Sequence, residues 1–269
     1  MIKVGIVGVG TLGSELARWC VANADTEDVR LVGVVDIDKA REKKIRDDLK
    51  IKKAYTVSTL AMASDLIIEA ASAGSAAAIV REAMSHGKDV MVMSSGGIIH
   101  KTKEIFQMAK DHRCCLYLPS GAIAGIDALK SANLGKIKSV SLTTRKPPIG
   151  FKDAPYLVKR KINVDNLNKE TLLFEGSAER AIAGFPQNIN VSATLSLAGI
   201  GAKRTKVKIY ATPGLRDNIH EVCVEGEFGS FYTRTQNRPS AQNPKTSGMA
   251  ILSAIATLKR ILNNVKLGT

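Results

Sequence analysis

The chain has 269 residues, of which 45% are hydrophobic and 24% charged, a composition typical of a globular protein with one large or two modest domains. No apolar stretch reaches the roughly 18 residues needed to cross a bilayer, and the N-terminus lacks the order of a signal peptide, so we expect no membrane association. The net charge of +14 raises the question of whether the protein binds nucleic acid. The cations are mixed with acids, as in Lys39–Lys53, and aromatic residues make up only 4% of the chain. We therefore expect no nucleic-acid partner, and a field that attracts small anions.

Four cysteines bear on the compartment: Cys20, Cys114, Cys115 and Cys223. None forms a CxxC pair, and adjacent Cys114 and Cys115 are poorly placed to bond to each other. This pattern favours reduced thiols in the cytoplasm. We expect no metal site.

The first part of the chain alternates short apolar runs with amphipathic stretches, which predicts a parallel sheet covered by helices on both faces. The predicted strands are Lys3–Val7, Leu31–Val35, Asp65–Glu69, Asp89–Met93 and Cys114–Leu118, with a weak sixth at Ala54–Val57. The predicted helices are Thr11–Ala24, Lys39–Leu49, Ser75–His86 and Lys101–His112. We expect residues 1–120 to form a doubly wound Rossmann domain with strand order 3-2-1-4-5-6.

After about Gly121 the pattern changes to strands interleaved with separate helices, which predicts an α+β domain over residues 121–269. The predicted strands are Ile137–Arg145, Lys206–Ala211 and Ile219–Phe231, the last with a hairpin turn at Gly226–Gly229. The predicted helices are Ala178–Ala183, Val191–Ala198 and Met249–Ile261. The sequence leaves open whether the last helix returns to the first domain.

A glycine motif follows the first strand and opens the first helix: Gly8, Gly10 and Gly13, with Thr11 and Leu12 between the last two. The first glycine permits a tight turn, the second lets the backbone approach a pyrophosphate, and the third allows close packing of helix and strand. The second strand ends in Asp36, where a ribose-binding carboxylate belongs. We expect this motif to bind a dinucleotide. The alternative is a purely structural turn, with Asp36 as the cap of a helix over Asp38–Leu49.

Asp36 favours NAD over NADP, because a carboxylate accepts hydrogen bonds from ribose hydroxyls and repels a 2′-phosphate. Lys39 and Arg41 lie close enough in sequence to leave NADP possible. Two loops at strand ends, Ala70–Ser72 and Ser94–Gly97, have small residues that leave room for a ribose and a nicotinamide, or form simple turns. From the first loop we take Ala71 and Ser72 as candidate cofactor contacts.

Among the four histidines, His86, His100 and His112 fall near predicted helix ends and are expected at the surface. His220 differs, because period-two alternation places it on the same strand face as Val222 and Val224. It is either a hydrogen-bonded core residue or an acid/base group that titrates near neutrality.

Several segments resemble those of L-aspartate dehydrogenases, and the resemblance extends over nearly the whole chain. They are SGAIAG at Ser120–Gly125, FEGSA at Phe174–Ala178, FPQNINV at Phe185–Val191, NIH at Asn218–His220 and NPKTS at Asn243–Ser247. The FPQNINV and NPKTS segments are far more specific than GxGxxG.

The resemblance implies that His220 is the catalytic residue and that an alanine of GAIAG and an asparagine of the NxN pair contact NAD. The matching positions stay open between Ala122 and Ala124, and between Asn188 and Asn190. Either asparagine can instead cap the helix beginning near Val191.

The implied reaction oxidises L-aspartate at its α-carbon to iminoaspartate, which is hydrolysed to oxaloacetate and ammonia or passed to pyridine nucleotide biosynthesis; reductive amination is the reverse. Two substrate carboxylates require cationic or N–H donors, for which Lys245 and Thr246 of the NPKTS segment are the first choice. Arg145, Arg234 and Arg238 are weaker candidates.

Other interpretations remain open. Homoserine-dehydrogenase-like and dihydrodipicolinate-reductase-like enzymes share the N-terminal pattern, and fold alone does not choose a substrate. A non-catalytic dinucleotide sensor is the alternative from another class. By analogy we expect a homo-oligomer, with a homodimer formed through the second domain's sheet.

Overall fold

A computed structural model describes residues 1–186, 190–240 and 243–268, with side chains omitted from 239 to 246. The chain forms two compact units. Unit 1 comprises Met1–Pro119 together with Ile251–Leu267, and unit 2 takes in Ser120–Ala250. The first break falls one residue before the predicted boundary of the Rossmann domain.

Unit 1 is built on a five-stranded sheet in the order β2-β1-β3-β4-β5, in which every pairing is parallel. The strands are β1 (Ile2–Val7), β2 (Val29–Val35), β3 (Leu66–Glu69), β4 (Asp89–Val92) and β5 (Leu116–Tyr117). The runs of buried residues on β1, β3 and β4 are typical of strands covered on both faces.

The predicted sixth strand at Ala54–Val57 is wrong. Helix α3 (Val57–Ala63) begins at this place, and Thr56 caps it. The Thr56 side chain accepts a hydrogen bond from the Thr59 backbone N–H, and the Thr59 hydroxyl oxygen accepts one from the Thr56 N–H. This reciprocal cap satisfies two backbone N–H groups at the start of the helix. Its contribution outweighs the local preference of these residues for a strand. The other five strands keep their predicted order.

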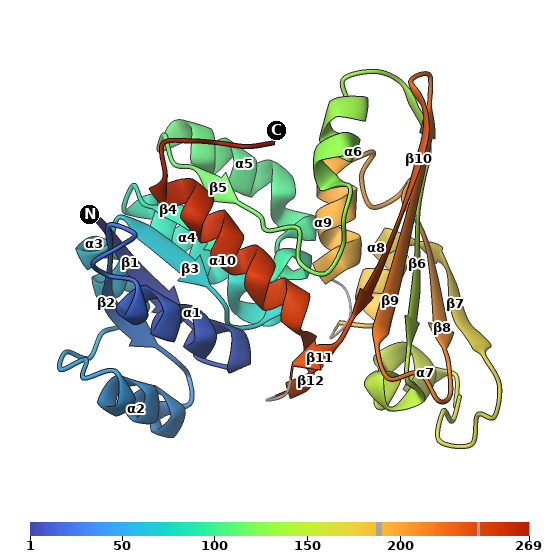
Figure 1. Ribbon diagram of the computed structural model, residues 1–269, viewed down its shortest axis with the longest axis horizontal. Coiled ribbons are helices and arrows are strands. Elements are labelled where there is room, and N and C mark those ends of the chain that lie inside the picture. Colours follow the sequence, from blue (N-terminus) through green and yellow to red (C-terminus); the bar gives the residue numbers. More distant parts are fainter. Residues whose placement is uncertain (187–189, 241–242, 269) are drawn as a thin grey trace. The chain divides into compact units, whose positions relative to one another are not determined.

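Helices cover both faces of the sheet in unit 1 (Figure 1). Helix α1 (Thr11–Ala22) and the C-terminal helix α10 (Gly248–Leu262) contribute Leu16, Cys20, Ala254 and Leu258 to one core cluster. Helices α3 and α4 (Ala73–Ser85) pack against the strands from the other side. Helices α2 (Lys39–Asp48) and α5 (Thr102–Asp111) complete the set. The last helix therefore packs on the unit formed by the start of the chain.

Unit 2 contains a second five-stranded sheet, in the order β10-β9-β6-β8-β7. Strands β6 and β8 pair parallel, and the other pairs are antiparallel. The strands are β6 (Ile137–Lys146), β7 (Thr171–Ser177), β8 (Lys206–Ala211), β9 (Asn218–Gly226) and β10 (Gly229–Asn237). The predicted hairpin is the β9–β10 pair, and Gly229 has the positive φ of 110° that its turn requires.

Strand β7 is absent from the predicted elements. A bulge between Leu172 and Phe174 places both Leu173 and Phe174 in the interior, so the alternation that identifies a half-buried strand is lost.

Helices α6 (Ile126–Ala132), α8 (Ala178–Gly184) and α9 (Asn190–Ala198) lie on one side of the unit 2 sheet (Figure 1). Along β6 and β9, Val140, Leu142, Val222 and Val224 form a buried row of side chains. We call the side of the sheet that carries this row the inner face. The remaining elements are α7 (Pro155–Lys159) and the short pair β11 (Pro239–Ser240) and β12 (Asn243–Ser247).

Within the described residues, no helix has both the length and the apolar character needed to cross a membrane.

Candidate active site

The three glycines of the N-terminal motif are required for different reasons. Gly8 has a φ of 95°, and a Cβ there would lie 2.5 Å from the backbone of Ala70. A Cβ on Gly13 would lie 1.9 Å from the Gly8 carbonyl oxygen, so this position sets the close packing of α1 on β1. A Cβ on Gly10 would meet no atom of the described residues within 4 Å. The fold itself thus explains Gly8 and Gly13, whereas the space beside Gly10 is not filled by any described part of the chain.

Gly10 is also the N-cap of α1, and no side chain caps this helix start. Thr11, Leu12 and Gly13 form the first turn, whose N–H groups cannot all find partners within the helix. Together with the helix dipole, these donors suit an anionic group such as a pyrophosphate. The motif therefore fits a dinucleotide.

Asp36 stands at the end of β2 and is buried. Its Oδ2 accepts a hydrogen bond of 2.7 Å from the Val9 N–H, and its Oδ1 accepts one of 2.8 Å from the Asp38 N–H. The carboxylate thus ties the glycine turn to the end of β2. The cap of α2 is Asp38, whose side chain accepts from the N–H groups of Ala40 and Arg41, so the helix-cap alternative for Asp36 is wrong.

Lys39 and Arg41, the two cations that could bind the 2′-phosphate of NADP, both have acidic partners. The Lys39 ammonium lies 2.7 Å from the Glu42 carboxylate. The Arg41 guanidinium lies 3.2 Å from Asp38 and 3.9 Å from Asp36. A 2′-phosphate would have to compete with these carboxylates.

Glu69, at the end of β3, holds the next two loops and is completely buried. Its carboxylate accepts hydrogen bonds of 2.9 Å from the Ala71 N–H and the Ser94 N–H. Burial raises the pKa of Glu69 above its ordinary value, although these hydrogen bonds oppose the shift. Ala71 and Ser72 are exposed, and the Ser72 hydroxyl lies 2.9 Å from that of Ser75. Both candidates therefore lie on an ordered loop at the carboxyl edge of the sheet.

In unit 2, His220 lies on β9 with only 3% of its surface exposed. Its Nδ1 is 3.0 Å from the hydroxyl of Thr144, the residue opposite it on β6. Burial, and then the charge of Lys146, lower the pKa of His220 to about 3. The imidazole is therefore neutral at physiological pH, and it does not titrate near neutrality as we expected of an acid/base group. One of its ring nitrogens keeps a lone pair.

Lys146 is the last residue of β6, two positions beyond Thr144, and is half-buried. Side chains two apart on a strand lie on one face, so Lys146 and His220 share the inner face. Burial lowers the pKa of Lys146 to about 8. The sequence contained a signal for this pair, because the alternation of Ile137–Lys146 ends its apolar row with Thr144 and Lys146.

Two further polar residues of β10 hold the SGAIAG loop to this face. Thr235, opposite His220, donates a 2.8 Å hydrogen bond to the Ala122 carbonyl, and Asn237 donates one of 2.9 Å to the same oxygen. Ala122 is buried and Ala124 is exposed, with its carbonyl accepting from Thr233. The structure thus connects the loop of both candidate alanines to the strand beside His220.

The remaining candidates belong to other parts of unit 2. Asn190 is the first residue of α9 and is exposed, whereas Asn188 lies outside the described residues. Lys245 and Thr246 belong to β12, and their side chains lie outside the described part of the chain. Arg145 pairs with Glu221 on the outer face of the sheet, and Arg234 approaches the same carboxylate, which explains both arginines as surface ion pairs.

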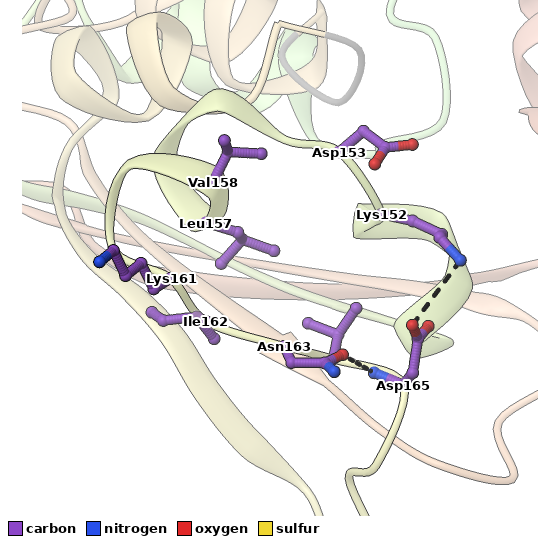
Figure 2. Close-up of a pocket in the computed structure, with 9 residues that line it drawn as sticks. Lys152, Asp153, Leu157, Val158, Lys161, Ile162, Asn163 and Asp165 are labelled. Carbon is purple, nitrogen blue, oxygen red and sulfur yellow. Dashed lines mark hydrogen bonds and ion pairs between the residues drawn. The ribbon is translucent and has the colours of Figure 1, made fainter.

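A cavity of about 270 Å³ lies elsewhere in unit 2, between α7 and the segment that follows it (Figure 2). Lys152 and Asp165 form a 3.6 Å ion pair at its edge, and Leu157, Val158 and Ile162 supply apolar walls. None of the predicted site residues lines it. Among the described residues, no group of His, Cys, Asp and Glu is placed to hold a metal ion.

A glycine turn on a parallel doubly wound sheet, followed by a second sheet with a buried polar cluster, defines the class of two-part dinucleotide-binding dehydrogenases. Comparison with protein families agrees. Residues 8–119 match the NAD-binding domain of homoserine dehydrogenase, and residues 127–261 match the C-terminal domain of aspartate dehydrogenase.

Whole-chain relatives specify the family. The chain is 46% identical to the L-aspartate dehydrogenase of Methanosarcina acetivorans and 34% identical to that of Nitrosopumilus maritimus, with both chains covered completely in each case. The chain belongs to the L-aspartate dehydrogenase family. Among solved structures, aspartate dehydrogenase from Thermotoga maritima has the same fold, with a TM-score of 0.71 at 23% identity over the full length of both chains. Scyllo-inositol dehydrogenase from Lactobacillus casei matches with a TM-score of 0.56 at 17% sequence identity. The match covers 100% of this chain and 90% of the Lactobacillus chain.

Proposed function

We propose that this protein oxidises L-aspartate to iminoaspartate, which hydrolyses to oxaloacetate and ammonia, and that it also catalyses the reverse reductive amination. The observation that carries the proposal is His220, a buried neutral imidazole on the inner face, in a chain that matches L-aspartate dehydrogenases from end to end.

Oxidation at a carbon that bears an amine removes a hydride from the carbon and a proton from the nitrogen. A bound nicotinamide dinucleotide supplies the hydride acceptor. His220 is the proton acceptor, for the amine or for the water that attacks the imine. In the tautomer that donates from Nδ1 to the Thr144 hydroxyl, the Nε2 lone pair is available for that proton.

The cofactor is held by the glycine turn and the loops at the carboxyl edge of unit 1. Gly8, Gly10, Thr11, Leu12 and Gly13 provide the turn and the helix start for the pyrophosphate. Ala71 and Ser72 contribute the next loop. By the family resemblance, Ala122 or Ala124 and Asn188 or Asn190 add contacts from unit 2.

NAD is the preferred cofactor in this proposal. Asp36 presents a carboxylate where the ribose hydroxyls of NAD are bound in this fold. The same charge disfavours a 2′-phosphate, and the acidic partners of Lys39 and Arg41 leave those cations less available to bind one. NADP is then the weaker alternative.

Lys245 and Thr246 are proposed to bind substrate, on the strength of the family-like NPKTS segment. We place the enzyme in the cytoplasm, with its product available to pyridine nucleotide biosynthesis. We propose a homodimer, with no nucleic-acid partner. The outer face of the unit 2 sheet supports the dimer, since Leu172 and Tyr232 are exposed there.

The test is a substrate panel. Protein and NAD are mixed separately with L-aspartate, L-homoserine and L-alanine, and the absorbance of the reduced cofactor is followed. Turnover of L-aspartate alone is the expected result. Preferential turnover of L-homoserine would support the homoserine-dehydrogenase interpretation, and dihydrodipicolinate with reduced cofactor tests the related reductase. NAD binding without turnover of any of these substrates would instead favour a sensor.

A further inference from the structure

The inner face of unit 2 contains a cation, Lys146, on the same face as His220. Lys146 ends β6, and the residue beside it on β8 is Ala211, whose small side chain is fully buried. On the other side, β9 presents His220 opposite Thr144. Lys146 therefore lies at the end of the row that begins with Val140 and Leu142.

We propose that Lys146 is a substrate-binding residue whose ammonium group holds one carboxylate of a dicarboxylate substrate beside the imidazole of His220. The inference rests on the proposed function, because that function supplies a substrate with two carboxylates. Two negative charges cannot enter a partly buried site without cationic or N–H partners. An ammonium group on the face of the catalytic histidine is such a partner.

The electrostatics of the pair support this arrangement. Among the residues whose side chains are described, Lys146 is the ionisable group whose charge lowers the pKa of His220, so it favours the neutral imidazole. A carboxylate bound to Lys146 would offset that charge and raise the pKa of His220 toward its ordinary value. The histidine would then be a stronger proton acceptor with substrate bound than without it.

The chain offers a matched control. Lys138 lies on the same strand as Lys146 but is exposed, near the opposite end of β6. Lys138→Met removes the same charge from the same sheet at a distance from His220. Lys146→Met keeps the length of the apolar stem, and Lys146→Arg keeps the charge.

The first measurement is calorimetric titration of each variant, saturated with NAD, with succinate, a dicarboxylate that lacks the amine. We expect Lys146→Met to weaken succinate binding about 10- to 100-fold, the effect of losing a charge-assisted hydrogen bond in a buried site. Lys146→Arg should recover part of the loss, and Lys138→Met should match the wild type. NAD affinity and melting temperature, measured on the same samples, should not fall in any variant.

The second measurement is the pH profile of kcat/KM for L-aspartate, which a merely structural lysine would not move. Loss of the neighbouring cation should shift the acidic limb of the Lys146→Met profile to higher pH. The inference would be overturned if Lys146→Met bound succinate as tightly as the wild type, or if the acidic limb of its pH profile did not move. In either case, turnover of L-aspartate by the wild type would still uphold the proposed function. Absence of aspartate turnover in the wild type would reject the proposed function, whatever the succinate titration shows.

Discussion

His220 should make the protein sensitive to acid. The pKa of its imidazole is about 3 in the folded protein and 6.5 in its ordinary state, so below pH 6.5 the unfolded chain binds a proton that the folded chain does not. Stability is therefore fully present above pH 6.5, falls as the pH decreases, and reaches its full loss near pH 3. Each pH unit in this window costs about 1.4 kcal/mol, so at about pH 5 the loss is about 2 kcal/mol.

The perturbation is His220→Asn, which keeps a polar group opposite Thr144 but does not titrate. Urea unfolding, followed by circular dichroism at about pH 7.5 and about pH 5, should show about 2 kcal/mol less acid destabilisation in the variant than in the wild type. Trp19, the single tryptophan, lies in unit 1, so its fluorescence compared with circular dichroism tests whether the two units unfold together.

A direct check is the NMR titration of the His220 ring, assigned by its loss in the variant. Its signal should not titrate between about pH 4 and 8. An inflection near the ordinary pKa of histidine, or equal acid sensitivity in both proteins, would refute the argument from burial.

Three further predictions concern the cofactor and the reaction. Gly10→Val should weaken NAD binding in a fluorescence titration and leave the melting temperature within about 2 °C of wild type. Gly13→Ala should instead destabilise the fold by about 2–3 kcal/mol, because its Cβ meets the Gly8 carbonyl. Unchanged NAD affinity in Gly10→Val would mean that the motif is only a structural turn. Asp36→Ser should narrow or invert the preference for NAD over NADP, measured as kcat/KM. The control is Asp36→Asn, which retains an acceptor for the Val9 N–H. A wild-type protein that clearly prefers NADP would contradict the role of Asp36 in binding the ribose hydroxyls. His220→Ala should lower kcat about 10²–10⁴-fold with little change in NAD affinity, and near-normal kcat in the folded variant would argue against proton transfer by this residue.

The sequence predicted the elements whose physical signal is local. The β1–turn–α1 segment is specified by its glycines and apolar run, and the strand-face position of His220 follows from period-two alternation within one strand. The missed features depend on pairing between distant segments. Thr144 and His220 are 76 positions apart, and only the register of β6 with β9 brings them together. Strand β7 was missed because its bulge removes the alternation, and Ala54–Val57 was mistaken for a strand because a reciprocal threonine cap outweighs strand propensity.

The C-terminal helix has a consequence for the order in which the protein can be completed. Ala254 and Leu258 fill the same cluster as Leu16 and Cys20, so the core begun by the first residues is closed by nearly the last ones. During synthesis, the core cluster of unit 1 stays incomplete on the face that α10 covers until α10 has left the ribosome. Nearly all of unit 2 is one continuous segment, Ser120 to Ala250, so its sheet and helices do not share this constraint. A fragment ending at Pro119 would therefore lack part of its core, and an isolated cofactor domain would require the last helix to be joined back to it.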